Sequence, residues 1–130
     1  MGGRGASSGG RRGRAPVGYR TTGFSSEIRI VRNIKTGKGL PRKSVRPNEK
    51  YFGTDSSGKI IQLRVFDKNK NAKMDIDWSH SFEGHPAGTV HYHVWKNGIR
   101  SKEHNKLPVK DVIKYKDLIE KASQRDDLKW

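Results

Sequence analysis

Two carboxylates and three imidazoles lie close together in the middle of this 130-residue sequence, and such groups can do acid–base or metal chemistry. Asp75 and Asp77 are two residues apart, as are His91 and His93, and His80 lies between the two pairs. Residues i and i+2 of a β-strand project from the same face. If the two segments are neighbouring strands, these side chains meet on one surface.

General acid–base cleavage of a phosphodiester is the first chemistry that this set predicts. A neutral histidine can take the proton of an attacking hydroxyl, and a protonated second histidine can give one to the leaving oxygen. In RNA the attacking group can be the 2′-hydroxyl, so this route needs no metal. Arg64 and Lys73 are the cations nearest in sequence, and we expect them to stabilise the phosphate charge. The predicted catalytic residues are Asp75, Asp77, His80, His91 and His93.

A metal site is the second chemistry that the same residues predict. A His-x-His pair on a strand can give two imidazoles to one ion, and Asp77 can complete the set with His91 and His93. Two imidazoles and a carboxylate with open positions suit a divalent ion such as Zn²⁺, and Mg²⁺ is the other candidate cofactor. The ion would serve either catalysis or structure.

A solvated outer face is the alternative to both chemistries. An Asp-x-Asp or His-x-His pair on a strand often faces solvent without a role. Trp78 and Trp95 are more typical of core or sheet-face packing than of base stacking.

Three segments with strand periodicity, followed by one helical segment, would position these residues. Apolar and polar residues alternate in 60–66, 74–78 and 89–95, with shorter strand-like runs at 26–32 and 51–52. Pro108 can open a helix that runs to about Gln124, with apolar residues at helical spacing. We therefore expect an α+β fold: a small antiparallel sheet of three to five strands, with a C-terminal helix packed on one face. The predicted reactive residues would lie on the other face.

The positive charge is concentrated near the N-terminus. The chain has 28 Lys and Arg against 13 Asp and Glu, a net charge of +15, and residues 1–50 contribute 13 − 2 = +11 of it. The Gly- and Arg-rich start predicts a disordered basic arm over 1–22, followed by a single small domain over 23–130. The arm serves either phosphate binding, by Arg4, Arg11, Arg12 and Arg14, or solubility alone.

Several classes of protein are excluded by what the sequence lacks. It contains no cysteine, so disulfide frameworks and thiolate chemistry are excluded. No P-loop, HExxH or GxSxG motif occurs. No apolar run is long enough to span a membrane and no signal peptide is evident, so we expect a cytoplasmic or virion-associated protein without a membrane partner.

The segment 51–95 resembles a family of small C-terminal domains in bacterial polymorphic toxins and phage head-associated proteins. The family pattern is R-x-[FY]-D, then D-I-D-[FW]-x-x-H, then H-x-H-x-W. The matching residues here are Arg64, Phe66, Asp67, Asp75, Ile76, Asp77, Trp78, His80, His91, His93 and Trp95. The first turn has Asn69–Asn71 in place of a glycine, and the later loop carries Phe82 and Glu83 where more glycine and histidine are expected. The opening MGGRGASSG is similar to the ends of small phage and prophage proteins. The resemblance implies a nuclease of phage or mobile-element origin.

The function predicted from the sequence is thus a toxin-like endonuclease, acting on RNA rather than DNA. The alternative is a phage protein that binds nucleic acid or a host or phage partner without catalysis, in packaging, in the virion or as an inhibitor of host defence.

Overall fold

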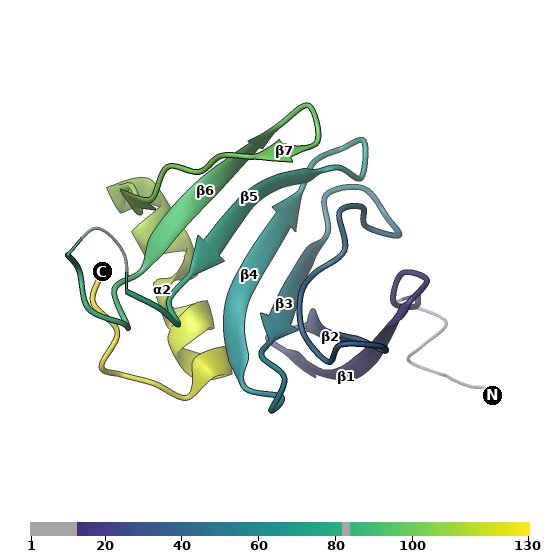
Figure 1. Cartoon of the computed structure of the whole chain (residues 1–130), viewed down its shortest axis with the longest axis horizontal. Helices are drawn as coiled ribbons and strands as arrows, with labels where there is room; N and C mark the ends of the chain where they lie inside the picture. The colour runs from purple at the N-terminus through teal and green to yellow at the C-terminus, as the bar shows by residue number, and fades with distance from the viewer. Residues whose placement is uncertain (1–12, 82–83) are drawn as a thin grey trace.

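The computed structural model describes residues 13–81 and 84–130, and these are mostly β-sheet (Figure 1). The strands are β1 (Tyr19–Ser25), β2 (Ile28–Asn33), β3 (Lys50–Thr54), β4 (Ile60–Phe66), β5 (Ala72–Asp77), β6 (His91–Lys96), β7 (Ile99–Arg100) and β8 (Asn105–Lys106). The helix α2 (Val109–Ser123) follows them. The predicted α+β fold with three to five antiparallel strands is therefore wrong, because the described residues form one eight-stranded sheet with a single helix.

The strands follow the order β1-β2-β3-β4-β5-β6-β7, and β8 pairs with the other end of β6. All neighbours are antiparallel except β2 and β3, which are parallel, with Ile30 opposite Phe52. A parallel pair cannot be closed by a tight turn, so the chain must cross the sheet between them. Residues 34–49 make this crossing and lie over one face of β3 and β4 (Figure 1).

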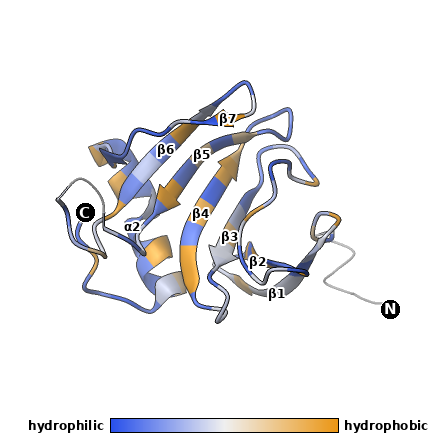
Figure 2. Ribbon diagram, in the orientation of Figure 1, coloured by the Kyte–Doolittle hydropathy of each residue, from blue (hydrophilic) through white to orange (hydrophobic). Residues whose placement is uncertain are grey.

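Helix α2 covers the face of the sheet opposite the crossing segment (Figure 1), and the main core lies between the helix and the sheet. Tyr115, Ile119 and Ala122 of the helix are buried against Leu63, Ile76 and other strand residues. The predicted helix is confirmed: Pro108 precedes it, and Gln124 ends it in the left-handed conformation (φ 57°). Val109 and Ile113 are two of the apolar residues at helical spacing, but they do not pack on the sheet and are 75% and 80% exposed. Apolar residues recur along the strands at the sheet centre (Figure 2).

The crossing segment builds a second, smaller core on the face away from the helix. Leu40 is buried there with Val31, Tyr51, Phe66 and Ala72. The polar residues of the predicted site share this face, so the small core supports them from one side.

The N-terminal boundary predicted from composition falls inside a strand. Residues 19–22 belong to β1, which pairs with β2 from Tyr19 opposite Asn33 to Ser25 opposite Ile28. Of the arm predicted over 1–22, residues 1–12 lie outside the described part of the chain. Within the part of the chain that is described, no helix is both long and apolar enough to cross a membrane.

Replacing Gly53 by alanine should destabilise the protein through the crossing segment. A Cβ atom at this position would lie 2.7 Å from Cγ of Leu40. Overpacking of this kind costs about 1–3 kcal/mol. Urea unfolding of Gly53→Ala, Leu40→Ala and the double variant measures the coupling. We expect the Gly53 substitution to cost clearly less when Leu40 is already alanine, whereas additive effects would contradict the contact.

Candidate functional site

The strand register brings the two acidic and the two histidine residues together. Asp75 is opposite His93, and Asp77 is opposite His91, on the antiparallel strands β5 and β6. All four side chains are buried. They lie on the face away from α2, as the alternation predicts. There they form a buried polar layer, whereas the alternative prediction of a solvent-facing pair of strands expected them to be exposed.

Asp75 is held by two guanidinium groups. Arg64 donates from Nε to Oδ1 (2.6 Å) and from Nη2 to Oδ2 (2.9 Å), and Nε of Arg100 donates to Oδ2 (2.8 Å). Burial opposes ionisation of this carboxyl, but the hydrogen bonds and charge of Arg64 outweigh it and lower the pKa of Asp75 below its usual range. The carboxylate of Asp75 is therefore ionised and held in place by the two arginines. This geometry favours a positioning role for Asp75 over the reactive role predicted from the sequence.

The guanidinium group of Arg64 also makes several contacts within the protein. Its Nη1 donates to the carbonyl oxygens of Leu40 (3.0 Å) and Pro41 (3.1 Å), and the guanidinium stacks on Trp95 at 4.8 Å from the ring centre. Its donors therefore connect β4, β5 and the crossing segment. The predicted phosphate contact by Arg64 would have to replace bonds that hold the fold.

Asp77 has a different environment. Its Oδ2 accepts a bond from Nη2 of Arg100 (2.5 Å) and lies 3.5 Å from Nε2 of His93 and 3.9 Å from Nε2 of His91. Its Oδ1 is buried and has no hydrogen-bond partner among the described residues. Burial raises the pKa of Asp77 to about 6, helped by the nearby charge of Asp75 and opposed by Arg100.

Backbone carbonyls fix both buried imidazoles. Nδ1 of His91 lies 3.1 Å from the carbonyl oxygen of Thr89, and Nδ1 of His93 lies 2.9 Å from that of Ser101. A carbonyl oxygen can only accept, so each Nδ1 carries the proton and each neutral ring has its lone pair on Nε2. Burial lowers the pKa of His91 to about 4, and burial with the charge of Arg100 lowers that of His93. Both rings are neutral at pH 7.

Two further histidines surround this pair. His104 lies 4.5 Å from His93 and 5.2 Å from His91, and His80 lies 4.8 Å from His91, between ring centres. The side chain of His80 is exposed. Burial lowers its pKa, as do the nearby charges of His104 and Arg100. Four of the five histidines therefore form one cluster.

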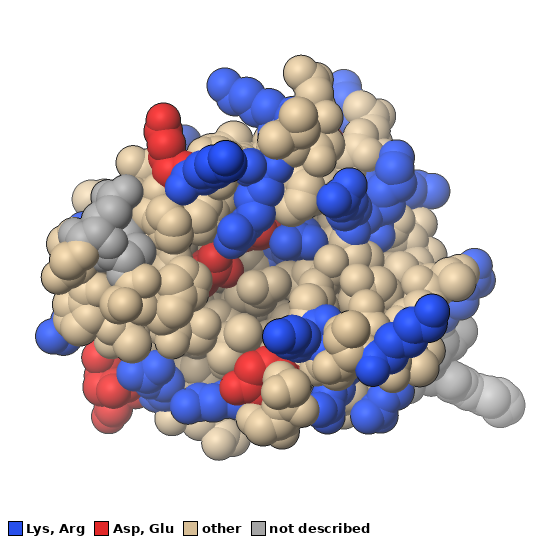
Figure 3. All heavy atoms as spheres, viewed as in Figure 1, with Lys and Arg blue, Asp and Glu red and all other residues tan. Residues whose placement is uncertain are grey.

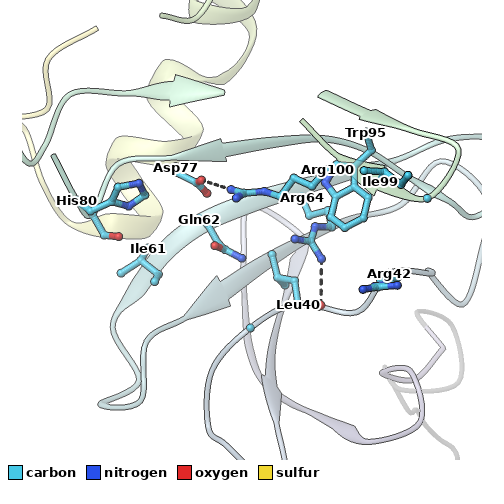
Figure 4. Close-up of a pocket in the computed structure, with 13 residues that line it drawn as sticks. Leu40, Arg42, Ile61, Gln62, Arg64, Asp77, His80, Trp95, Ile99 and Arg100 are labelled. Atoms are coloured by element: carbon cyan, nitrogen blue, oxygen red, sulfur yellow. Dashed lines mark hydrogen bonds and ion pairs between the residues drawn. The ribbon is translucent and has the colours of Figure 1, made fainter. Parts of the chain in front are cut away.

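A cleft of about 750 Å³ opens beside the cluster (Figure 4). His80 lies at one end and Arg42 at the other, with Asp77 and Arg100 between them (Figure 4). Its remaining lining residues are Gly39, Leu40, Ile61, Gln62, Arg64, Ser79, Trp95, Gly98 and Ile99. His91 and His93 do not line the cleft, whereas Asp77 and His80 do, so a substrate bound in the cleft would contact Asp77 and His80.

Positive charge surrounds this cleft. Figure 3 shows Lys and Arg side chains gathered around a hollowed centre of the face, with acidic atoms in the hollow. Arg42 is exposed on one rim, and the side chain of Arg100 is 37% exposed. Such a surface attracts polyanions.

The other predicted nucleic-acid contacts lie elsewhere. Lys73 is exposed in a groove with Lys50, Lys110 and Lys114, beside the helix. An irregularity in the pairing of β4 and β5, between Val65 and Phe66, breaks the alternation and removes Lys73 from the face of Asp75. Arg14 is exposed, and Arg4, Arg11 and Arg12 lie outside the described residues.

Three residues of the site were not predicted from the sequence: Arg42 on the rim of the cleft, Arg100 and His104. Asn97-Gly98 is a two-residue hairpin turn, which pairs Trp95 with Arg100. Since strand alternation places Trp95 on the same face as His91 and His93, this register could have placed Arg100 there. His104 had no such signal, because it precedes β8, a two-residue strand whose pairing with β6 depends on tertiary structure.

Comparison with protein-family models, curated proteins and solved structures finds no significant match to this chain. The resemblance to polymorphic-toxin domains therefore stays a prediction.

Proposed function

We propose that this protein cleaves phosphodiester bonds in nucleic acid, and that RNA is its preferred substrate. The cleft carries the proposal, because it places an imidazole, a carboxylate and two guanidinium groups around one volume: His80, Asp77, Arg42 and Arg100. The net charge of +15 supports a polyanionic substrate. The assignment to a phage or mobile element, and to toxin-like use, rests on the sequence resemblance and stays a prediction.

The exposed imidazole is the proton acceptor in this proposal. His80 would take the proton of a ribose 2′-hydroxyl, and the resulting oxygen would attack the adjacent phosphorus. The 5′-oxygen of the next nucleotide would leave with a proton from water in the cleft. The products are a 2′,3′-cyclic phosphate and a 5′-hydroxyl. Arg42 and Arg100 would bind the phosphate oxygens as their charge increases.

Cleavage should depend on His80 and much less on a histidine outside the cluster. We expect the wild-type protein to cleave labelled RNA, and His80→Gln to cleave it about 100-fold more slowly, as for the loss of a general base. His85→Gln is the matched control, because His85 is exposed on the same loop and is not among the cleft residues. Reactions with RNA and with DNA, each with and without EDTA, identify the substrate and any metal requirement. Equal rates for the wild type and His80→Gln would contradict the proposal.

Binding without cleavage is the second candidate, and the ion pairs of the cleft favour it. Arg64 and Arg100 already pair with Asp75 and Asp77, so fewer donors are available to a transition state. In that case RNA affinity falls steeply with salt, and no product forms under any condition.

A further inference from the structure

We propose that Asp77, His91 and His93 form a binding site for one divalent transition-metal ion of the zinc type. The site would bind its ion whether or not the protein cleaves nucleic acid.

The hydrogen bonds of the two imidazoles prepare them to coordinate a metal. The Thr89 and Ser101 carbonyls accept bonds from Nδ1 of His91 and His93, at 3.1 Å and 2.9 Å, so in each ring Nε2 is the nitrogen whose lone pair could bind a metal ion. Metal-binding histidines almost always donate their other N–H to a carbonyl or carboxylate in this way. Both accepting carbonyls belong to the backbone, so ring orientation is set by the fold.

The distances between the possible ligand atoms fit one small ion. In a tetrahedral zinc site with bonds of about 2.0–2.1 Å, neighbouring donor atoms are about 3.3 Å apart. Oδ2 of Asp77 lies 3.5 Å from Nε2 of His93 and 3.9 Å from Nε2 of His91. One donor atom from each of the three residues lies within 4.8 Å of the others. Relative to that spacing, Oδ2 of Asp77 is about 0.2 Å too far from Nε2 of His93 and about 0.6 Å too far from Nε2 of His91, so small side-chain movements would close the site around an ion.

The Asp77, His91 and His93 triad contains more hydrogen-bond acceptors than donors. Nε2 of His93 and Oδ1 of Asp77 are buried without hydrogen-bond partners among the described residues. Both atoms accept hydrogen bonds, and a buried acceptor without a donor costs free energy. A metal ion bound by Nε2 of His93 and by both oxygens of the Asp77 carboxylate would satisfy the two atoms together. Arg100 also bonds Asp75, so it can keep that contact if the ion takes its place at Asp77.

A second set of three, His80, His91 and His104, also has ligand atoms within 4.8 Å of one another, and it shares His91. The Nε2 of His91 can serve only one ion. We assign the ion to the Asp77 triad because its three residues are buried, whereas His80 is exposed, and because a backbone carbonyl orients each of its imidazoles. Two nitrogens and one carboxylate oxygen favour Zn²⁺ over Mg²⁺ or Ca²⁺, which prefer all-oxygen environments.

Calorimetric titration of chelator-stripped full-length protein with Zn²⁺ tests the site, with Mg²⁺ as the comparison ion. We expect one Zn²⁺ per chain, a higher melting temperature with Zn²⁺, and no response to Mg²⁺ at the same concentration. His93→Gln keeps most of the side-chain volume and should weaken zinc binding at least tenfold. Asp77→Asn should do the same, which preserves the test if His93→Gln does not fold. His85→Gln should bind like the wild type.

Three outcomes would overturn the inference: no saturable zinc binding, unchanged affinity in both triad variants, or a loss of binding in His104→Gln that the triad variants do not share. The last outcome would assign the ion to the second set of histidines. The RNA assay is separate from this one. Zinc binding without cleavage supports the metal site and contradicts the proposed function, and metal-independent cleavage without zinc binding does the reverse.

Discussion

Arg64→Met should destabilise the protein by about 3–5 kcal/mol, the usual cost of removing one partner from a buried ion pair. Methionine keeps most of the apolar stem of the arginine but loses the bidentate bond to Asp75 and both carbonyl bonds to Leu40 and Pro41. Asp75 is fully buried, and among the described residues Arg100 would then be the remaining cation paired with its charge. Urea unfolding at pH 7 measures the loss.

Arg42→Met is the matched control for this prediction. Arg42 lines the same cleft but is exposed, so its loss should change the free energy of unfolding by less than about 0.5 kcal/mol. The double variant Arg64→Met, Asp75→Asn removes the uncompensated charge, and it should recover part of the stability. If Arg64→Met and Arg42→Met cost the same, Arg64 does not have the structural role described above.

Asp77→Asn should stabilise the metal-free protein at pH 8 by up to about 3 kcal/mol and have little effect at pH 4. Burial raises the pKa of Asp77 to about 6, from 3.8 in the unfolded chain. A carboxyl with a raised pKa contributes stability that is fully present below pH 3.8 and is lost as the pH rises through about 6. A tenfold change in an acid dissociation constant corresponds to about 1.4 kcal/mol. Asparagine resembles the protonated carboxyl, so it keeps this stability at every pH.

Urea unfolding at pH 4, 6 and 8 in the presence of a chelator tests this expectation. The quantity to compare is the difference between variant and wild type. Other groups, such as Asp75 with its lowered pKa, change the wild-type stability in the opposite direction. A variant that is less stable than the wild type by the same amount at pH 4 and pH 8 would show that ionised Asp77 is not under strain.

Alternation along single strands allowed the main features of the site to be predicted. Segments 60–66 and 74–78 pair as β4 and β5, and the histidines of 89–95 lie beside the two aspartates. Strand periodicity is local, so one sequence reveals which residues share a face. It does not reveal how much they are buried, and the aspartates and histidines expected at a surface are buried.

The size and topology of the sheet depend on contacts that local sequence does not encode. The parallel pairing of β2 with β3 joins residues more than twenty positions apart through a segment without regular structure. Strands β7 and β8 are two residues long and have no periodicity to detect. The irregularity that moved Lys73 to the helix side likewise follows from pairing, since a shift of one residue changes the face.

The crossing segment 34–49 has a consequence for how the length of this chain can vary. Surface connections usually accept insertions, because few contacts depend on their length. Here the backbone is fixed at Ser44 and Arg42, which bond Lys70 and Ala72, and at Leu40 and Pro41, whose carbonyls bind Arg64. An added residue between 40 and 44 would move at least one of these groups. Insertions in this segment should therefore destabilise the protein, and the part of the cleft that Gly39, Leu40 and Arg42 line can change its shape only by substitution.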